Sequence, residues 1–342
     1  MGTKAKSPVI IISRTDRLGD LLLSFPAIHL VREMHPNAKI ILLVRRYTKD
    51  LLYGQNFIDK ILCVDEYSQA DLVKILQNEH PDWFVALYTD KFVGYLARMT
   101  KAKYRIGPLS KMHSWLVYNY GVWQKRSRGI KNEAEYNLDL VKKISPQFQI
   151  AQAYTCLYFG EEHREAAMKA LPVDFSMHQH RLVIINPFGG GSAKNISLEE
   201  YRKLGDILAT SLPNCRIIYL ARNEEETAAI MAGKDTAQSV FMNTGSILNL
   251  VALIDLAQLY IGPSTGPTHI AAFLDKPVVA IYPRIRNQSP IRWGVIGNKY
   301  TTYVQPPIPC PQKYGCRKSC PEYDCFDKIK ASEIAEICMK YL

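Results

Sequence analysis

A stretch of small and polar residues at 262–269 has the composition of a turn that binds phosphate. An apolar strand pattern precedes it and an apolar helical pattern follows it. Gly262 and Gly266 let the backbone approach a ligand, and Pro267 suits a first helical turn because its missing N–H would be unpaired there. The free N–H groups of such a helix end attract anions. A capped turn without a ligand explains the composition equally well.

Three side chains of this stretch are candidates for the phosphate site. Ser264 or Thr265 can cap the helix, and His269 in its first turn can donate a hydrogen bond to a phosphate oxygen.

A second glycine-rich stretch, at 186–195, follows the strand that opens the second half of the chain. Gly190 and Gly191 permit a backbone cradle, and Lys194 adds a positive charge. A flexible loop with a solvated lysine is the alternative interpretation. Two such loops in one domain favour a diphosphate more than either does alone. Neither is a Walker loop, and G-x-G-x-x-G is missing after the first strand of each half.

Three consecutive glutamates at 224–226 follow another predicted strand. Glu224, nearest the strand end, is the candidate acceptor for ribose hydroxyls. An acidic first turn of a helix is an equally good explanation.

The loop at 13–20 follows the first strand and opens at the C-terminal edge of the predicted sheet. Asp20 stands at the start of a helix, with Asp16 nearby and Arg14 and Arg17 beside it. A carboxylate there can act as a general base toward an attacking hydroxyl, and the arginines and the helix dipole would keep it ionised. On sequence alone a helix cap is the more common role for such an aspartate.

The elements that would position these residues alternate between strand and helix in both halves of the chain. Continuous apolar strands separated by helical patterns predict an α/β protein with doubly wound parallel sheets in two Rossmann-like domains that face a cleft. We expect the domains to span 1–172 and 173–330, with a linker near 172–180. A final helix at 331–342 is expected to pack back toward the first domain.

The chain has 342 residues and a formal charge of +11, so an anionic partner is expected. Between Asp90 and Glu133 it has no acidic residue, ten basic residues and several interleaved aromatic ones. That combination suits a membrane interface or a phosphorylated glycolipid, and single-stranded nucleic acid or a plain basic surface are the alternatives. The candidate acceptor-binding residues are Arg17, Lys111, Arg126, Arg128 and Lys131.

No apolar run is long enough for a membrane span or a secretory signal, which predicts a cytoplasmic protein, bound at most to the surface of the inner membrane. Four cysteines cluster near the C-terminus, at 310, 316, 320 and 325. Their spacing is not the paired CxxC of a zinc site, so we expect no stoichiometric metal.

Together these motifs resemble glycosyltransferase family 9, typified by the ADP-heptose:lipopolysaccharide heptosyltransferases. Residues 14–20 followed by Pro26 are similar to the family's N-terminal signature, and residues 262–272 to its C-terminal one. Lys194 stands where the family has a lysine on the donor diphosphate, and the tail Cys325-Phe326-Asp327-Lys328-Ile329 also recurs. The resemblance covers essentially the whole chain.

The resemblance implies a GT-B fold, an acceptor bound on the N-terminal domain and a nucleotide-diphosphate sugar donor on the C-terminal one. It also implies an inverting transfer with Asp20 as the base, in which heptose moves from ADP-heptose to a lipopolysaccharide-core-type glycolipid. Asp-x-Asp is missing from the sequence, which agrees with a metal-independent reaction without a cofactor. A UDP- or GDP-sugar donor and a non-catalytic basic binder are the alternatives. Some heptosyltransferases have Asp where this chain has Ser264.

Overall fold

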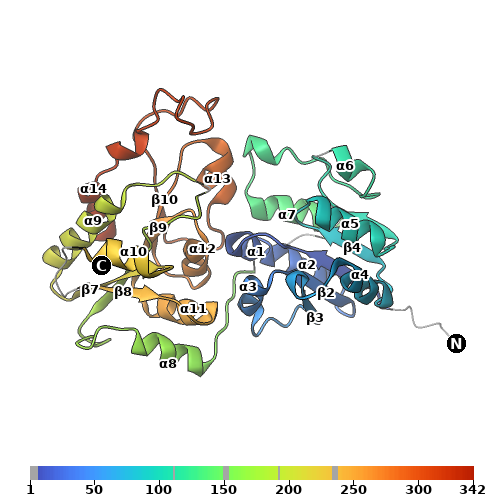
Figure 1. Ribbon diagram of the computed structural model, residues 1–342, viewed down its shortest axis with the longest axis horizontal. Helices are drawn as coiled ribbons and strands as arrows, with labels where there is room; N and C mark the ends of the chain where they lie inside the picture. The colour runs from blue at the N-terminus through green and yellow to red at the C-terminus, as the bar shows by residue number, and fades with distance from the viewer. Residues whose placement is uncertain (1–6, 111, 149–153, 192, 233–237) are drawn as a thin grey trace. The chain divides into compact units, whose positions relative to one another are not determined.

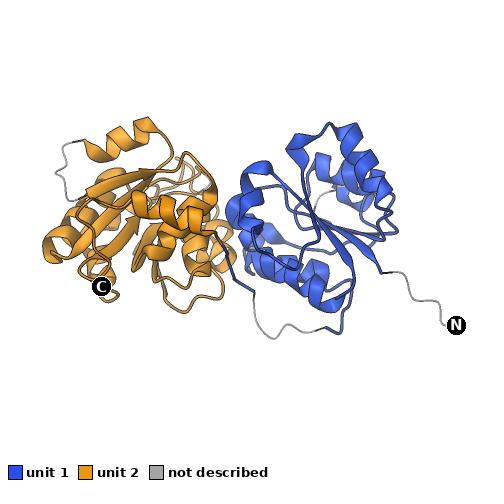
Figure 2. Cartoon of the chain, turned by 90° about the horizontal axis from the view of Figure 1, so that it is seen from below, with its two compact units in different colours: residues 1–158 blue, residues 159–342 orange. Residues whose placement is uncertain are grey.

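The computed structural model divides the chain into two compact units, residues 1–158 and 159–342 (Figure 2). It describes residues 7–110, 112–148, 154–191, 193–232 and 238–342. The division lies earlier than the expected one at 172, because the helix α8 (Glu161–Lys169) packs on α11 (Ile247–Leu256) of the second unit. The expected linker at 172–180 therefore lies within the second unit.

The first unit is built on a parallel five-stranded sheet in the order β3-β2-β1-β4-β5. Val, Ile and Leu fill these strands, as expected for a sheet covered on both faces. The order reverses between β1 and β4, so the loops that follow these two strands are neighbours. The strands are β1 (Val9–Ser13), β2 (Lys39–Val44), β3 (Lys60–Cys63), β4 (Trp83–Ala86) and β5 (Tyr104–Ile106).

Helices flank this sheet in alternation with the strands (Figure 1). The segment 18–34 forms two helices. The first ends at Leu22, and the second begins after its N-cap Ser24, with Pro26, which lacks an N–H, in its first turn. The helices are α1 (Leu18–Leu22), α2 (Phe25–Met34), α3 (Arg46–Lys49), α4 (Gln69–Asn78), α5 (Lys91–Met99), α6 (Met112–Trp115) and α7 (Glu133–Val141), with 3₁₀ turns η1 (Asp50–Leu52), η2 (Val64–Glu66) and η3 (Arg126–Arg128).

The second unit repeats the plan with a parallel six-stranded sheet in the order β11-β10-β9-β6-β7-β8. Here the order reverses between β6 and β9, so the loops that follow these two strands are neighbours. The strands are β6 (Arg181–Ile185), β7 (Cys215–Ala221), β8 (Gln238–Met242), β9 (Leu259–Pro263), β10 (Val278–Ile281) and β11 (Thr301–Val304). The remaining helices are α9 (Leu198–Ser211), α10 (Glu224–Met231), α12 (Gly266–Phe273), α13 (Pro290–Trp293) and α14 (Ala331–Cys338), with 3₁₀ turns η4 (Arg286–Gln288) and η5 (Cys325–Lys328).

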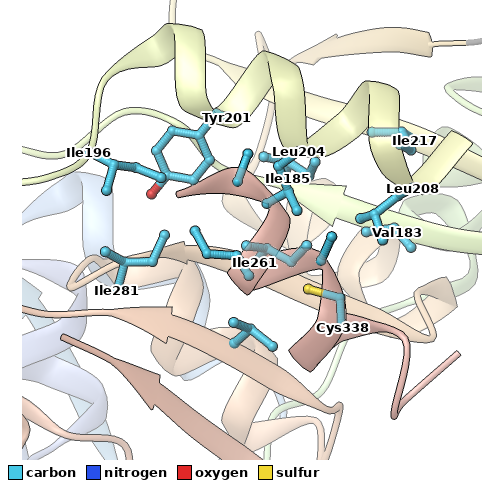
Figure 3. Packing of buried hydrophobic residues seen from close by; sticks show 14 of the residues in the cluster. Val183, Ile185, Ile196, Tyr201, Leu204, Leu208, Ile217, Ile261, Ile281 and Cys338 are labelled. Carbon is cyan, nitrogen blue, oxygen red and sulfur yellow. The ribbon is translucent and has the colours of Figure 1, made fainter. Parts of the chain in front are cut away.

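The C-terminal helix α14 belongs to the core of the second unit. It packs against α9 and β10, and Ile334 and Cys338 are fully buried there. Figure 3 shows this core, with Tyr201, Leu204 and Leu208 of α9 above the sheet and Cys338 of α14 among the same apolar side chains. The main contacts of α14 within the second unit are those with α9 and β10.

Candidate active site

The first candidate site lies where β1 runs into α1. The buried strand ends at Ser13, and the next residue, Arg14, is only 2 % exposed although it is charged. Asp20 lies in the first turn of α1, where a carboxylate also interacts favourably with the helix dipole. Arg17 precedes the helix and is exposed.

Arg14 collects three carboxylates around one guanidinium. Its Nη2 donates to Asp20 Oδ1 at 2.6 Å, its Nε lies 2.8 Å from Asp16 Oδ1, and its Nη1 lies 3.4 Å from Glu133 Oε1. Nη1 also donates to the carbonyl of Leu87 in the loop after β4 and to Asn137. A planar guanidinium with five donors suits such a site, because a lysine could not reach all of these partners.

Burial sets the charges of this cluster. Burial alone would lower the pKa of Arg14, but Asp16, Asp20 and Glu133 raise it above its usual value, so Arg14 stays charged. Burial raises the pKa of Asp16 to about 7, against the opposing effect of Arg14. In the part of the chain that the structure describes, the carboxylate of Asp20 has no hydrogen-bond partner besides Arg14, so its second oxygen is free to accept one.

Helix α7 braces the cluster from a distant part of the sequence. Glu133 and Asn137 are buried on its inner face, and Asn137 Nδ2 donates to the carbonyl of Leu23 and to Ser24 Oγ, at the junction of α1 and α2. Glu133 and Asn137 were not among the site residues predicted from the sequence. Their spacing carries a signal, since both are in helical phase with the apolar Leu140.

The residues expected to bind an acceptor have different surroundings. Arg126 is an ion-pair partner of Glu133, and Lys131 Nζ lies 2.7 Å from Asp139. Arg128 and Arg17 are exposed. Lys111 lies outside the described residues. Arg126 is therefore part of the buried charge cluster, and Arg17 and Arg128 remain as exposed cations.

The second candidate site lies at the switch point of the other sheet. Asn186 follows β6, and its Nδ2 donates to Thr265 Oγ1 at 3.1 Å in the turn between β9 and α12. The two glycine-rich stretches thus meet. An added Cβ on Gly262 would lie 3.1 Å from Asn186 Cβ, so this glycine is explained by the approach of the neighbouring loop.

The N-terminus of α12 has no side-chain cap, although Thr265 occupies the capping position and Gly266 the first helical one. Ser264 interacts with the Tyr282 hydroxyl, and Thr268 Oγ1 donates to the carbonyl of Pro263. The backbone N–H groups of the first turn therefore remain available to an anion.

His269 is 3 % exposed in the first turn of α12. Burial lowers its pKa to about 4, so its ring is neutral near pH 7. Its Nδ1 lacks a hydrogen-bond partner within the described ranges. A neutral imidazole can donate one hydrogen bond to a phosphate oxygen, but it supplies no positive charge.

Lys194 contacts the cysteine-rich tail. Its Nζ donates to the carbonyl of Tyr323 and lies 3.4 Å from the centroid of that ring. A pocket lies at this contact. It is lined by Lys194, Tyr323 and the four clustered cysteines at 310, 316, 320 and 325. Gly190 and Gly191 precede this lysine, and Gly191 has a φ of +74°, which favours glycine.

The glutamates at 224–226 divide into two kinds. Glu224 is exposed in the first turn of α10, while Glu226 is buried and accepts hydrogen bonds from the backbone and side chain of Arg222. Glu224 is therefore the one of these two whose side chain is accessible to a ligand.

Across the described ranges, no group of three or more His, Cys, Asp and Glu side chains is placed to hold a metal ion. Burial raises the pKa of Cys316 to about 11, so that thiol is protonated near neutral pH. Over the same residues, no helix is long and apolar enough to cross a membrane.

Comparison with known proteins decides the family. The sequence profile of glycosyltransferase family 9 (heptosyltransferase) matches residues 70–323, well over half of the chain. The chain belongs to glycosyltransferase family 9. This family 9 protein is 28 % identical over 312 residues to a Haemophilus influenzae protein named as a candidate glycosyltransferase, covering 87 % of this chain and 89 % of that one.

Solved structures of family 9 enzymes share the fold of this glycosyltransferase. A family 9 crystal structure from Veillonella parvula matches with a TM-score of 0.84 and 14 % identity over 100 % of this chain and 99 % of that one. The Escherichia coli ADP-heptose LPS heptosyltransferase II matches with a TM-score of 0.76 and 15 % identity over 98 % of each chain. The fold is thus the GT-B type, as expected from the sequence.

Proposed function

We propose that this glycosyltransferase moves heptose from ADP-heptose to a hydroxyl of a lipopolysaccharide-core-type glycolipid, with inversion and without a metal. The observation that carries the proposal is Asp20, which is held through one oxygen by Arg14 at 2.6 Å while its other oxygen is open to a substrate hydroxyl. The names of the family and of the E. coli heptosyltransferase support the choice of donor and acceptor.

In the proposed step, the acceptor oxygen forms a bond to the anomeric carbon of the donor. The bond from that carbon to the diphosphate breaks, and its electron pair leaves with ADP. Asp20 takes the proton of the hydroxyl, since an ionised carboxylate beside Arg14 can act as a general base. A single displacement of this kind inverts the configuration at the anomeric carbon.

The second unit would hold the donor in this proposal. The uncapped N-terminus of α12 and Lys194 would stabilise the negative charge that develops on the diphosphate. The other donor residues would be Gly190, Gly191, Ser264, Thr265, Gly266 and His269, with Glu224 on the ribose. The acceptor would be bound by Arg17, Arg128, Lys131 and Lys111. An acceptor of this class would place the enzyme at the cytoplasmic face of the inner membrane.

Two measurements test the function. Thermal unfolding with ADP, UDP and GDP should show the largest stabilisation by ADP, because the nucleotide that binds best stabilises most. ADP should then be released from ADP-heptose only when a lipopolysaccharide-core glycolipid is added. A larger shift with UDP or GDP would contradict the choice of base. Binding of glycolipid without ADP release would favour the non-catalytic binder.

A further inference from the structure

Five large apolar side chains of the first unit are unusually exposed. Burial normally removes such side chains from water, and large exposed apolar surfaces mark interaction sites. We name the following residues the apolar patch, with their exposed fractions: Met112 (85 %), Leu116 (81 %), Trp123 (65 %), Ile130 (61 %) and Trp115 (58 %).

The patch is continuous although its residues come from separate turns. The rings of Trp115 and Trp123 meet edge to face, with centroids 5.5 Å apart. Trp123 and Ile130 line one pocket together with Lys125 and Lys131. Trp115, Trp123 and Ile130 therefore form one surface. Met112 lies three residues before Trp115 in α6, on the same face of that helix, and Leu116 directly follows Trp115.

The segment that carries the patch is firmly held underneath. Tyr118 is buried and its hydroxyl lies 2.6 Å from Thr89 Oγ1. The backbone N–H of Leu109 donates to the carbonyl of Val122, and Trp115 Nε1 donates to the carbonyl of Leu109. The polar end of the Trp115 ring is thus satisfied by the protein, which leaves its apolar part outside as a fixed feature.

The segment that carries the patch is strongly basic. Residues 91–132 contain no acidic residue, and the exposed Lys125 lines the same pocket as Trp123 and Ile130. Lys131 also lines the pocket, where Asp139 of α7 pairs with it. A partner for this surface therefore needs an apolar region that contacts the patch and negatively charged groups that contact the neighbouring cations.

The geometry points to an anionic lipid bilayer as the partner of the apolar patch, an inference that rests on the proposed glycolipid acceptor. Aromatic and aliphatic side chains insert at the boundary of headgroups and acyl chains while neighbouring cations meet anionic headgroups. Met112, Leu116 and Ile130 have no planar ring on which a base could stack, which argues against single-stranded nucleic acid. The surface would hold the enzyme where its acceptor lies.

Sedimentation of the full chain with lipid vesicles tests the inference. Vesicles of phosphatidylcholine alone are compared with vesicles that also contain phosphatidylglycerol, at low and high salt. Binding should be stronger to the anionic vesicles, by about fivefold for each cation that engages the surface, and should weaken with salt. The double variant Trp115→Ser/Trp123→Ser should bind about tenfold or more weakly.

The matched control is Val173→Ser/Met177→Ser, two exposed apolar residues of the second unit. It should bind vesicles like the unmodified protein. The thermal unfolding midpoint and the circular dichroism spectrum should be unchanged in both double variants, which shows that the unit carrying each substitution remains folded. Equal binding to neutral and anionic vesicles, or unchanged binding of the tryptophan variant, would overturn the inference. A tryptophan variant that instead loses self-association or RNA binding would overturn it in favour of that partner.

The outcome is separable from that of the proposed function. Vesicle binding without glycolipid-dependent ADP release supports the docking surface and contradicts the reaction. Sugar transfer without vesicle binding supports the reaction and contradicts the docking surface.

Discussion

Arg14 Nη2 and Asp20 Oδ1 lie 2.6 Å apart, across six residues of sequence. The arginine is fully buried, whereas the carboxylate is partly open, with 13 % of its side chain exposed. Arg14 thus fixes the orientation of Asp20 through one oxygen and leaves the other oxygen open. The same cluster contains Asp16, which allows the two carboxylates to be compared directly.

Asp20→Asn should fold, because the amide oxygen can still accept from Arg14. It should lower the rate of sugar transfer by about 10²–10⁴-fold, the usual contribution of a general base. The measurement is glycolipid-dependent release of ADP, with stabilisation by ADP as the check on folding. Asp16→Asn is the matched control and should retain most of the rate. If Asp16→Asn loses as much activity as Asp20→Asn, the base is misassigned.

Arg14→Lys should disturb both stability and rate. A lysine cannot reach Asp16, Asp20, Glu133 and the carbonyl of Leu87 together, so buried carboxylates lose their partner. Complete removal of one member of a buried ion pair costs about 3–5 kcal/mol of the free energy of unfolding, and the lysine, which keeps the charge but not all the contacts, should lose part of that. Urea unfolding measures that loss. The maximal rate of the folded variant should fall while its KM for the donor stays constant.

Arg98→Lys provides the control for the arginine substitution, because Arg98 is exposed on α5. It should change neither the free energy of unfolding nor the rate. An Arg14→Lys variant with unmodified stability and rate would show that the cluster does not position Asp20.

Lys194→Met should weaken binding of ADP by about 10- to 100-fold, the free energy of one hydrogen bond to a charged group. Binding of adenosine, which lacks the diphosphate, should be unchanged. Isothermal titration with both ligands measures the difference. Lys203→Met, at an exposed position of α9, should bind ADP normally. An equal loss for ADP and adenosine would contradict the contact between Lys194 and the diphosphate.

His269 should make the protein less stable in acid. Its pKa is about 4 in the folded state and near 6.5 when unfolded, so the unfolded chain binds more protons between these values. The contribution of His269 to the free energy of unfolding is fully present above pH 6.5. It decreases as the pH falls, by about 2–3 kcal/mol between pH 7 and pH 4.5.

Urea unfolding of His269→Gln at the two pH values tests this. The variant should lose less stability on acidification than the unmodified protein by that amount. His178→Gln, at an exposed position, should lose as much free energy of unfolding between pH 7 and pH 4.5 as the unmodified protein does. Parallel losses in His269→Gln and the unmodified protein would rule out titration of His269 as a cause.

Ile334→Ala should destabilise the second unit by about 2–5 kcal/mol, because this side chain of α14 is fully buried in the hydrophobic core. Glu336→Ala on the exposed side of α14 should change the free energy of unfolding by less than about 0.5 kcal/mol. Thermal unfolding of both variants measures the two effects. A small effect of Ile334→Ala would mean that α14 is not part of this core.

The repeating pattern of apolar strands and helices determined the fold class, because a continuous apolar strand such as 182–185 can only be covered on both faces. Local turn chemistry likewise determined where the phosphate-type turns begin, since glycine and proline restrict the backbone independently of distant contacts. Asp20 was found in this way, as a carboxylate at the start of a helix after a buried strand.

The partners of these residues were decided only by tertiary structure. Glu133 and Asn137 reach Arg14 across more than a hundred residues of sequence, and Lys194 meets Tyr323 over a similar span. Arg126 looked like a surface cation in the sequence, yet it faces Glu133. Charge and spacing are local properties, whereas burial and ion pairing depend on which distant segments the fold brings together. That is why Asp20 could be proposed as the base from the sequence, whereas the residues that contact and orient it are seen only in the structure.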